Sequence, residues 1–321
     1  MLGRRAMVAL VGLGAGAALA QEPEWPVRSI RLISPFPPGG AADLLARLLA
    51  EALSTTLRQS VVVENRTGAG GSVGTEATVR SPPDGYTLVM GSTGPMAINQ
   101  FLSRLSYDPE RDLTPIVPVA VVQSVLVVHP AVAARTLPEL LAMARAEPGR
   151  LNYGSSGIGS AQHLFMELLK QQAGVDINHI PYRGTGPAMI DTVGGRLTMM
   201  FDTTPTALPH IRDGRVRALA VTAARRDPAL PDVPTVAETV PGFEAIGWYG
   251  VLGPAGLPPG VIARLHHAVD GLLADPGFAA RLTAQGVEPM RGTPAEFAAL
   301  IAADRARWGE VIRRGNIRAD G

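Results

Sequence analysis

Residues 30–43 read IRLISPFPPGGAAD, and residues 44–49 continue as LLARLL. The first apolar run predicts a short buried strand, and the leucine-rich segment predicts a helix. Between them, prolines restrict the backbone, while glycines allow positive φ and a close approach by another molecule. The first N–H groups of the helix face this turn without helical partners. Such a unit is typical of an anion site, although an ordinary turn that uses glycine only for its geometry fits equally well.

The composition indicates a folded protein with room for one large domain or two ordinary ones. The chain has 321 residues, of which 46% are hydrophobic and 18% charged. These proportions exclude a disordered chain. The sequence contains no cysteine, which excludes disulfides and thiolate metal sites.

The first twenty residues predict a secretory signal peptide. Arg4 and Arg5 precede the apolar run Ala6–Gly16, and Ala18–Ala20 supplies a small-x-small cleavage motif. We therefore expect cleavage after Ala20 and a periplasmic protein, exported by the general or the twin-arginine route. No later stretch is long enough to span a membrane, and a lipid anchor is not expected. Cleavage removes two arginines and changes the net charge from +1 to about −1, which does not favour nucleic-acid binding.

Strand and helix signals alternate along the rest of the chain. This alternation predicts an α/β fold with mostly parallel sheets. Strands are expected at residues 29–34, 60–65, 85–90, 119–129, 151–153, 178–182, 197–201 and 218–222, and helices at 41–57, 136–147, 161–173 and from 258 onward.

Two extended runs suggest that the chain builds two lobes. The run Val117–Val128 is unusually long for a single strand, and Ala245–Leu252 is a second extended run. A chain that leaves one lobe, builds a second and returns would cross twice in this way. The prediction is a first lobe of residues 21–122 plus 247–321, a second lobe of residues 123–246, and C-terminal helices packed on the first lobe.

A second glycine turn resembles the first in its position. Gly157 and Gly159 follow a predicted strand and precede the helix that starts at Ala161. If the two lobes face each other, both helix N-termini would meet an anion in one cleft, assisted by the hydroxyls of Ser155, Ser156 and Ser160.

Several enzyme and cofactor motifs fail on spacing. In Gly68–Gly74, the third glycine of a dinucleotide fingerprint would fall on Val73. A P-loop is excluded because Lys170, the only lysine, follows Leu169. Gly154–Gly157 does not match the hydrolase nucleophile motif, and the histidines lack zinc-ligand spacing. We expect no catalytic residue, cofactor or metal.

Three polar side chains leave alternatives open. His163 lies one turn into its helix and has a position from which it could line the cleft. Asp202 ends a predicted strand and either binds water, an amine or a hydroxyl, or caps a turn. Arg183 lies in a glycine-rich turn and either pairs with an acidic ligand or is solvated.

Ordered motifs along most of the chain resemble the substrate-binding proteins of tripartite tricarboxylate transporters, known as the TctC or Bug family. The matching segments are Trp25-Pro26, Pro35-Phe36-x-x-Gly39-Gly40-x-x-Asp43, Val63–Arg66 with Gly68–Gly71, Pro83–Leu88, Tyr107–Pro109, Tyr153–Gly157 with Gly159-Ser160, Pro181–Gly184, Leu219–Thr222, Leu230–Thr235, Gly253–Gly256 and Trp308.

The resemblance implies a two-lobed periplasmic-binding-protein fold, hinged on two crossing strands, that closes on a small carboxylate. One carboxylate group would lie between the two glycine turns, and the remaining wall would come from residues that vary with the ligand. The residues implied are Phe36, Pro37, Pro38, Gly39, Gly40, Asp43, Ser92, Thr93, Ser155, Ser156, Gly157, Gly159, Ser160, His163, Tyr182, Arg183, Gly184 and Asp202.

The resemblance also implies a function: a monomeric receptor that delivers its ligand to a membrane permease. Tricarboxylates, dicarboxylates, amino acids and aromatic acids all remain open as ligands. Phe36, Tyr182 and Trp248 are the aromatic side chains suited to stack on an aromatic acid. The rival interpretations are a sensor receptor that presents its ligand to a signalling partner and, with no motif to support it, an exported hydrolase.

Overall fold

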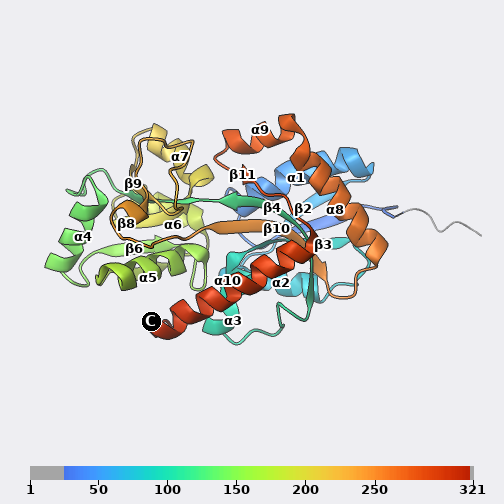
Figure 1. Ribbon diagram of the computed structural model, residues 1–321, viewed down its shortest axis with the longest axis horizontal. Coiled ribbons are helices and arrows are strands. Elements are labelled where there is room, and N and C mark those ends of the chain that lie inside the picture. The colour runs from blue at the N-terminus through green and yellow to red at the C-terminus, as the bar shows by residue number, and fades with distance from the viewer. Residues whose placement is uncertain (1–24, 319–321) are drawn as a thin grey trace, which may run out of the picture.

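The computed structural model describes residues 25–318 and shows two lobes, each built on its own sheet (Figure 1). The predicted signal peptide lies outside these residues. Within them, no helix is long and apolar enough to cross a membrane.

The first lobe is built on a six-stranded sheet in the order β11-β4-β10-β3-β1-β2. Its helices α1, α8 and α9 cover one face, and α2 and α10 cover the other. The strands are β1 (Ile30–Ser34), β2 (Val61–Asn65), β3 (Thr87–Ser92), β4 (Leu113–Val122), β10 (Gly247–Pro254) and β11 (Glu288–Pro289). The helices are α1 (Ala41–Leu57), η1 (Ala69–Gly71), α2 (Ser72–Val79), η2 (Gly94–Ile98), α3 (Asn99–Leu102), α8 (Pro259–Ala274), α9 (Pro276–Ala284) and α10 (Pro294–Gly315).

The second lobe is built on a five-stranded sheet in the order β7-β6-β8-β5-β9. Helices α4 and α5 cover one face, and α6 and α7 cover the other. The strands are β5 (Ser124–Val128), β6 (Asn152–Ser155), β7 (Asn178–Pro181), β8 (Met199–Thr203) and β9 (Arg217–Val221). The helices are α4 (Leu137–Ala146), α5 (Ala161–Ala173), α6 (Thr185–Val193), α7 (Thr204–Arg212) and η3 (Val236–Glu238).

The two extended runs cross between the lobes, as expected. β4 lies in the first sheet and β5 in the second, with only Gln123 between them. β10 pairs with β4 along the return path, and the two strands lie side by side at the centre of Figure 1. The residue boundaries of the two lobes stay a prediction.

The expectation of mostly parallel sheets is wrong, because both sheets are mixed. β1 pairs in parallel with β2 and β3, and β6 pairs in parallel with β7 and β8. By contrast, β10 is antiparallel to both β3 and β4, and β5 is antiparallel to both β8 and β9. The crossing strands cause this difference: β4 leads out of the first lobe and β10 leads back, so their directions are opposite.

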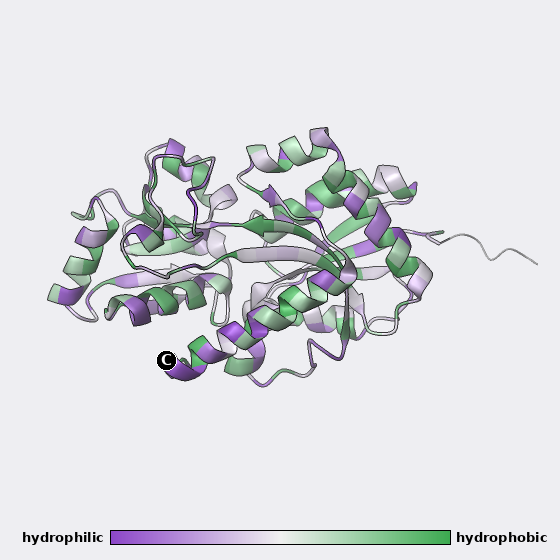
Figure 2. Ribbon diagram, in the orientation of Figure 1, coloured by the Kyte–Doolittle hydropathy of each residue, from purple (hydrophilic) through white to green (hydrophobic). Residues whose placement is uncertain are grey.

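The C-terminal helix contacts both lobes, whereas the sequence predicted packing on the first alone. Phe297, near its start, packs in the first lobe against Trp248. Trp308, three turns later, is fully buried in a cluster made mostly of second-lobe residues and stacks on Phe165 with ring centroids 5.5 Å apart. In Figure 2 this helix carries green and purple residues side by side, as expected for a helix with one buried face. α10 therefore bridges the lobes.

Candidate functional site

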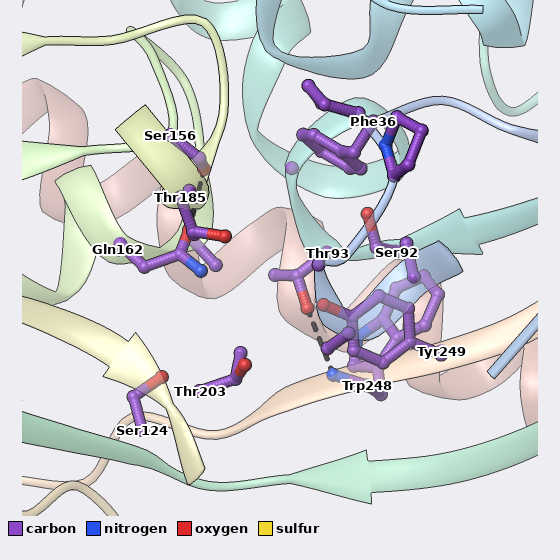
Figure 3. Close-up of a pocket in the computed structure, with 18 of the residues that line it drawn as sticks. Phe36, Ser92, Thr93, Ser124, Ser156, Gln162, Thr185, Thr203, Trp248 and Tyr249 are labelled. Atoms are coloured by element: carbon purple, nitrogen blue, oxygen red, sulfur yellow. Dashed lines mark hydrogen bonds between the residues drawn. The ribbon is translucent and has the colours of Figure 1, made fainter. Parts of the chain in front are cut away.

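A cavity of about 70 Å³ lies between the lobes, beside the crossing strands (Figure 3). The first lobe lines it with the turn between β1 and α1, the end of β3 with the start of η2, and the start of β10. The second lobe lines it with the start of β5, the turn before α5, the start of α6 and the end of β8. The ends of β3 and β8 and the turns that follow β1 and β6 lie at carboxyl ends of strands, which is where α/β proteins bind small ligands.

Three helix N-termini meet at this cavity. Gly40 and Ala41 belong to the start of α1, Gln162 to the first turn of α5, and Thr185 and Gly186 to the first turn of α6. The first N–H groups of a helix have no helical acceptor and carry the positive end of the helix dipole. The arrangement therefore favours an anion.

A buried carboxylate holds the first-lobe turn in shape. Asp43 is 4% exposed and accepts hydrogen bonds from the Gly39 N–H at 3.1 Å, from Arg47 Nε at 3.0 Å and from Asn65 Nδ2 at 2.8 Å. Burial alone would raise the pKa of Asp43, but these three hydrogen bonds outweigh burial and lower the pKa below its usual value. Gly39 and Asp43 do not line the cavity, so the structure places them as support for the turn.

Stacked neutral rings hold the second-lobe turn. Ser160 caps α5 by accepting from the His163 N–H at 3.3 Å, and the Gly159 N–H donates to His163 Nδ1 at 3.3 Å. His179 lies between His163 and Tyr153, with ring-centroid distances of 4.2 and 4.7 Å. Burial lowers the pKa of His163 to about 4 and the pKa of His179 to about 3. His163 therefore supports the turn from behind and does not line the cavity.

The structure brings together a serine–histidine pair that no sequence motif indicated. Ser155 Oγ lies 2.7 Å from His179 Nε2 and also accepts from the Gly157 N–H at 3.1 Å. The Ser155 side chain has no exposed surface and lines neither of the two cavities described here. A substrate has no access to this hydroxyl, so the pair fits a support role.

Asp202 is next to the lining residue Thr203 but does not line the cavity itself. It is 1% exposed, and its Oδ1 accepts from the Thr203 N–H at 2.8 Å, while Oδ2 has no partner among residues 25–318. Burial raises the pKa of Asp202 to about 7, against the opposing effect of hydrogen bonds from Thr206 and Thr203. The neighbouring Thr203 does line the cavity (Figure 3).

A second, larger cavity of about 790 Å³ adjoins the first and shares Phe36, Pro37 and Ser156 with it. The predicted residues Gly157, Tyr182, Arg183 and Gly184 line this second cavity. Gly184 has φ +124°, and a Cβ there would lie 2.7 Å from the Pro37 ring of the other lobe. The lobes thus touch across the cleft at a position that only glycine fits.

The predicted site residues divide into three groups. The central cavity is lined by Phe36, Pro37, Pro38, Gly40, Ser92, Thr93 and Ser156, and the second cavity by Gly157, Tyr182, Arg183 and Gly184. The residues that line neither cavity are Gly39, Asp43, Ser155, Gly159, Ser160, His163 and Asp202.

Sequence reasoning missed several lining residues. Thr185 and Gly186 follow a strand and Gly184, so the rule that found the other two turns would have found this one. Ser124, Gln162 and Tyr249 also line the cavity, and no sequence motif marks them. Within residues 25–318, no group of three or more histidine, aspartate or glutamate side chains is placed to hold a metal ion.

Comparisons with known proteins identify the family. Residues 45–317 match the profile described as tripartite tricarboxylate transporter family receptor, TctC. Protein BugT of Bordetella pertussis is 39% identical over 92% of this chain and 92% of its own length. A protein of unstated role from the tcbD-tcbE intergenic region of Pseudomonas sp. is 39% identical over 97% of this chain and 94% of its own length.

Solved structures agree with the family match. The chain resembles the R. palustris protein Rpa4515, solved with adipate, at a TM-score of 0.90 and 37% identity, covering 92% of this chain and 99% of that one. It resembles MatC of Rhodopseudomonas palustris, solved with bound malate, at a TM-score of 0.85 and 33% identity. The match covers 90% of this chain and 100% of that one. The two-lobed periplasmic-binding-protein fold expected from the sequence is therefore confirmed. The chain belongs to the TctC family of tripartite tricarboxylate transporter receptors, which are periplasmic solute-binding proteins.

Proposed function

We propose that this receptor captures a small organic carboxylate in the central cavity and delivers it, as a monomer, to the permease of a tripartite tricarboxylate transporter. The observation that carries the proposal is the meeting of three helix N-termini, from both lobes, at one cavity. Backbone N–H groups supply the donors, and the positive helix ends favour the negative charge.

The neighbouring structures support a carboxylate over other anions. Rpa4515 was solved with adipate and MatC with malate, and both share the fold of this chain at more than 30% identity. Closure of the lobes would exclude water from the cleft, which strengthens hydrogen bonds between N–H donors and a carboxylate. The ligand shifts the population toward the closed arrangement only as far as it binds that arrangement more tightly.

Gly40→Val tests the N–H contacts of the first-lobe turn. Gly40 has φ −83° and ψ 169°, an extended conformation that valine adopts readily, so the fold should persist. An added Cβ would lie 3.6 Å from Thr185 Oγ1 across the cleft, and the valine methyls would occupy the space in front of the α1 N-terminus. We expect a loss of affinity of about 100-fold, or about 2.7 kcal/mol.

The ligand is first found by a thermal-shift screen of carboxylic acids, because a tight ligand raises the unfolding temperature by mass action. Calorimetry then compares Gly40→Val with Gly260→Val, an exposed glycine in the first turn of α8 where an added Cβ meets nothing. Native affinity in Gly40→Val would refute the proposed contact. Turnover of a bound ligand would favour the enzyme alternative, and co-purification with a signalling protein instead of a permease would favour the sensor.

A further inference from the structure

Trp248 connects the central cavity to α10, the helix that bridges the two lobes. The residue lies on β10, is 3% exposed and lines the cavity (Figure 3). Its backbone N–H donates to Thr93 Oγ1 at 3.3 Å, and Thr93 lines the cavity as well. Its indole Nε1–H donates to Asp304 Oδ2 on α10 at 2.7 Å. A single residue therefore forms part of the cavity wall and contacts the bridging helix.

Two residues of α10 fix the orientation of this indole. Phe297 packs edge-on against it, with ring centroids 5.2 Å apart and ring planes at 88°. Asp304 follows Phe297 by seven residues, which places both on the same face of the helix. The edge-to-face contact limits the tilt of the ring, and the hydrogen bond determines which edge of the ring points toward α10.

The acceptor in this contact is a carboxylate. Burial raises the pKa of Asp304, and the hydrogen bond from Trp248, the charge of Arg307 and the Trp308 indole oppose that rise. The distance of 2.7 Å is typical of a charge-assisted hydrogen bond. Moving a carboxylate out of water costs free energy, and an apolar residue of similar volume often stabilises such a position equally well. The fold alone therefore does not require a carboxylate here, which points to a role in orienting the indole.

Loss of this acceptor would change the central cavity and not the larger one. An indole N–H without a buried acceptor is unfavourable, so the ring would turn until the N–H reaches another acceptor or water. Trp248 borders the central cavity and does not border the second cavity that adjoins it. A rotated ring would therefore alter the wall that a ligand in the central cavity meets, and would leave the second cavity as it is.

We propose that Asp304 is a positioning residue for ligand binding, which holds the Trp248 indole in one orientation through its Nε1–H and so keeps the wall of the central cavity in shape. This inference rests on the proposed receptor function and adds a residue of the bridging helix that acts on the ligand through Trp248. It holds for any ligand that occupies the central cavity.

The first test uses the indole signals of the free protein. The chain has three tryptophans, and the NMR signal of the Trp248 Nε1–H is the one that Trp248→Phe removes. Asp304→Leu takes away the acceptor at nearly constant volume, so exchange of this hydrogen with solvent should become about tenfold faster. Asp304→Asn keeps an oxygen that can accept from the indole and should preserve slow exchange. Unchanged exchange in Asp304→Leu would overturn the inference.

The second test measures affinity by calorimetry. The ligand is the acid with the largest effect in a thermal-shift screen that includes succinate, malate, adipate and citrate. Asp304→Leu should weaken its binding about tenfold, whereas Asp304→Asn should stay within about threefold of the wild type. The control is Glu310→Leu, which removes a carboxylate from an exposed position of the same helix and should leave the affinity unchanged.

A double-mutant cycle separates positioning from a general structural effect. Trp248→Phe keeps an aromatic ring but removes the N–H that Asp304 holds. If Asp304 acts through this N–H, Asp304→Leu should have no further effect on affinity in the Trp248→Phe protein. A further loss of about tenfold in that background would overturn the inference, because Asp304 would then act on the site by another route.

The outcomes separate the two proposals. If no carboxylic acid binds the wild-type protein, the proposed function fails and this inference fails with it. If an acid binds, but Asp304→Leu leaves its affinity unchanged, only the positioning inference fails. If Asp304→Leu does not fold, Asp304→Ala replaces it, with the same expected results in both tests.

Discussion

Two of the three turns that line the cavity, those before α1 and α5, are held in shape by opposite chemistry. The first-lobe turn depends on a charged carboxylate, Asp43, with Arg47 as its exposed partner. The second-lobe turn depends on neutral rings, with His163 stacked on His179 behind the glycines. Under the proposed function, the two turns would offer backbone donors to an anion with no cationic side chain among the described residues that line the central cavity. The difference in support implies that the two turns respond differently to mutation, pH and salt.

The largest expected effect is on the first turn. Asp43→Ala leaves the Gly39 N–H and Asn65 Nδ2 without their acceptor inside a buried turn. Loss of a buried, charged hydrogen-bond acceptor costs about 3 kcal/mol, so the free energy of unfolding should fall by that amount. Urea unfolding measures it, and ligand affinity should fall as well, because the turn no longer holds its shape. A loss below about 1 kcal/mol would contradict the support role of Asp43.

The second expected effect is acid sensitivity of the second turn. The folded pKa of His163 is lowered to about 4, so between pH 6.5 and 4 the unfolded chain binds the proton more readily. The contribution of neutral His163 to the free energy of unfolding is complete above pH 6.5 and is lost as the pH falls toward 4. Between pH 6.5 and 5 the loss is about 2 kcal/mol for His163 alone.

Asp202 changes the free energy of unfolding with pH in the direction opposite to His163, so an Asp202 variant serves as the control. The folded pKa of Asp202 is raised to about 7, so its contribution is complete below pH 3.8 and is lost as the pH rises toward 7. Asp202→Asn removes that contribution, and its stability should fall more steeply on acidification than that of the wild type. His163→Phe keeps a stacked ring and should reduce the acid loss, and the remainder belongs to His179, whose pKa is lowered to about 3. Parallel stability curves for all three proteins, from urea unfolding at pH 5, 6 and 7, would refute the assignment.

The smallest expected effect belongs to the exposed partner of the first turn. Arg47 contacts Asp43 at 2.9 Å, but its side chain is 54% exposed. Such pairs contribute about 0.5 kcal/mol, and salt screens them. Arg47→Ala should therefore lower the free energy of unfolding slightly, and 0.5 M salt should reduce the difference from wild type. A loss as large as that of Asp43→Ala would show that the ion pair, and not the hydrogen bonds of the turn, supports the site.

Much of the fold was predictable from local signals. The expected bounds of α1 and α5 match the structure, because glycine or a capping serine precedes each helix and the chain reverses after it. The two crossing runs were visible in the sequence, the first as an unusually long β run and the second as an extended run between Pro-Gly and Gly-Pro pairs. Strand direction was not predictable, because β4 and β10 pair across a sequence gap of more than a hundred residues, and no local pattern reports which way a returning strand runs.

The candidate site was predictable where the backbone forms it and hidden where side chains do. Gly40 and Ser156 follow from turn patterns, and both line the cavity. Gln162 occupies an ordinary helical position, and only the folded structure shows that it lines the cavity. Asp43 and His163 were predicted to line the site, but both support the turns instead. Whether a residue lines the cavity or supports a turn depends on the direction of its side chain, which sequence spacing does not reveal.

The tryptophan near the end of the chain limits how the receptor can open. Trp308 stacks on Phe165 of the second lobe in a buried cluster, while the start of its helix packs in the first lobe. A motion that pulled the halves apart along this helix would have to expose that indole, at a cost of several kcal/mol for an aromatic of this size. Motion that widens the opposite rim leaves the indole in place. The packing around α10 should therefore be the same with and without bound ligand. Only the rim of the cleft opposite α10 should change its width.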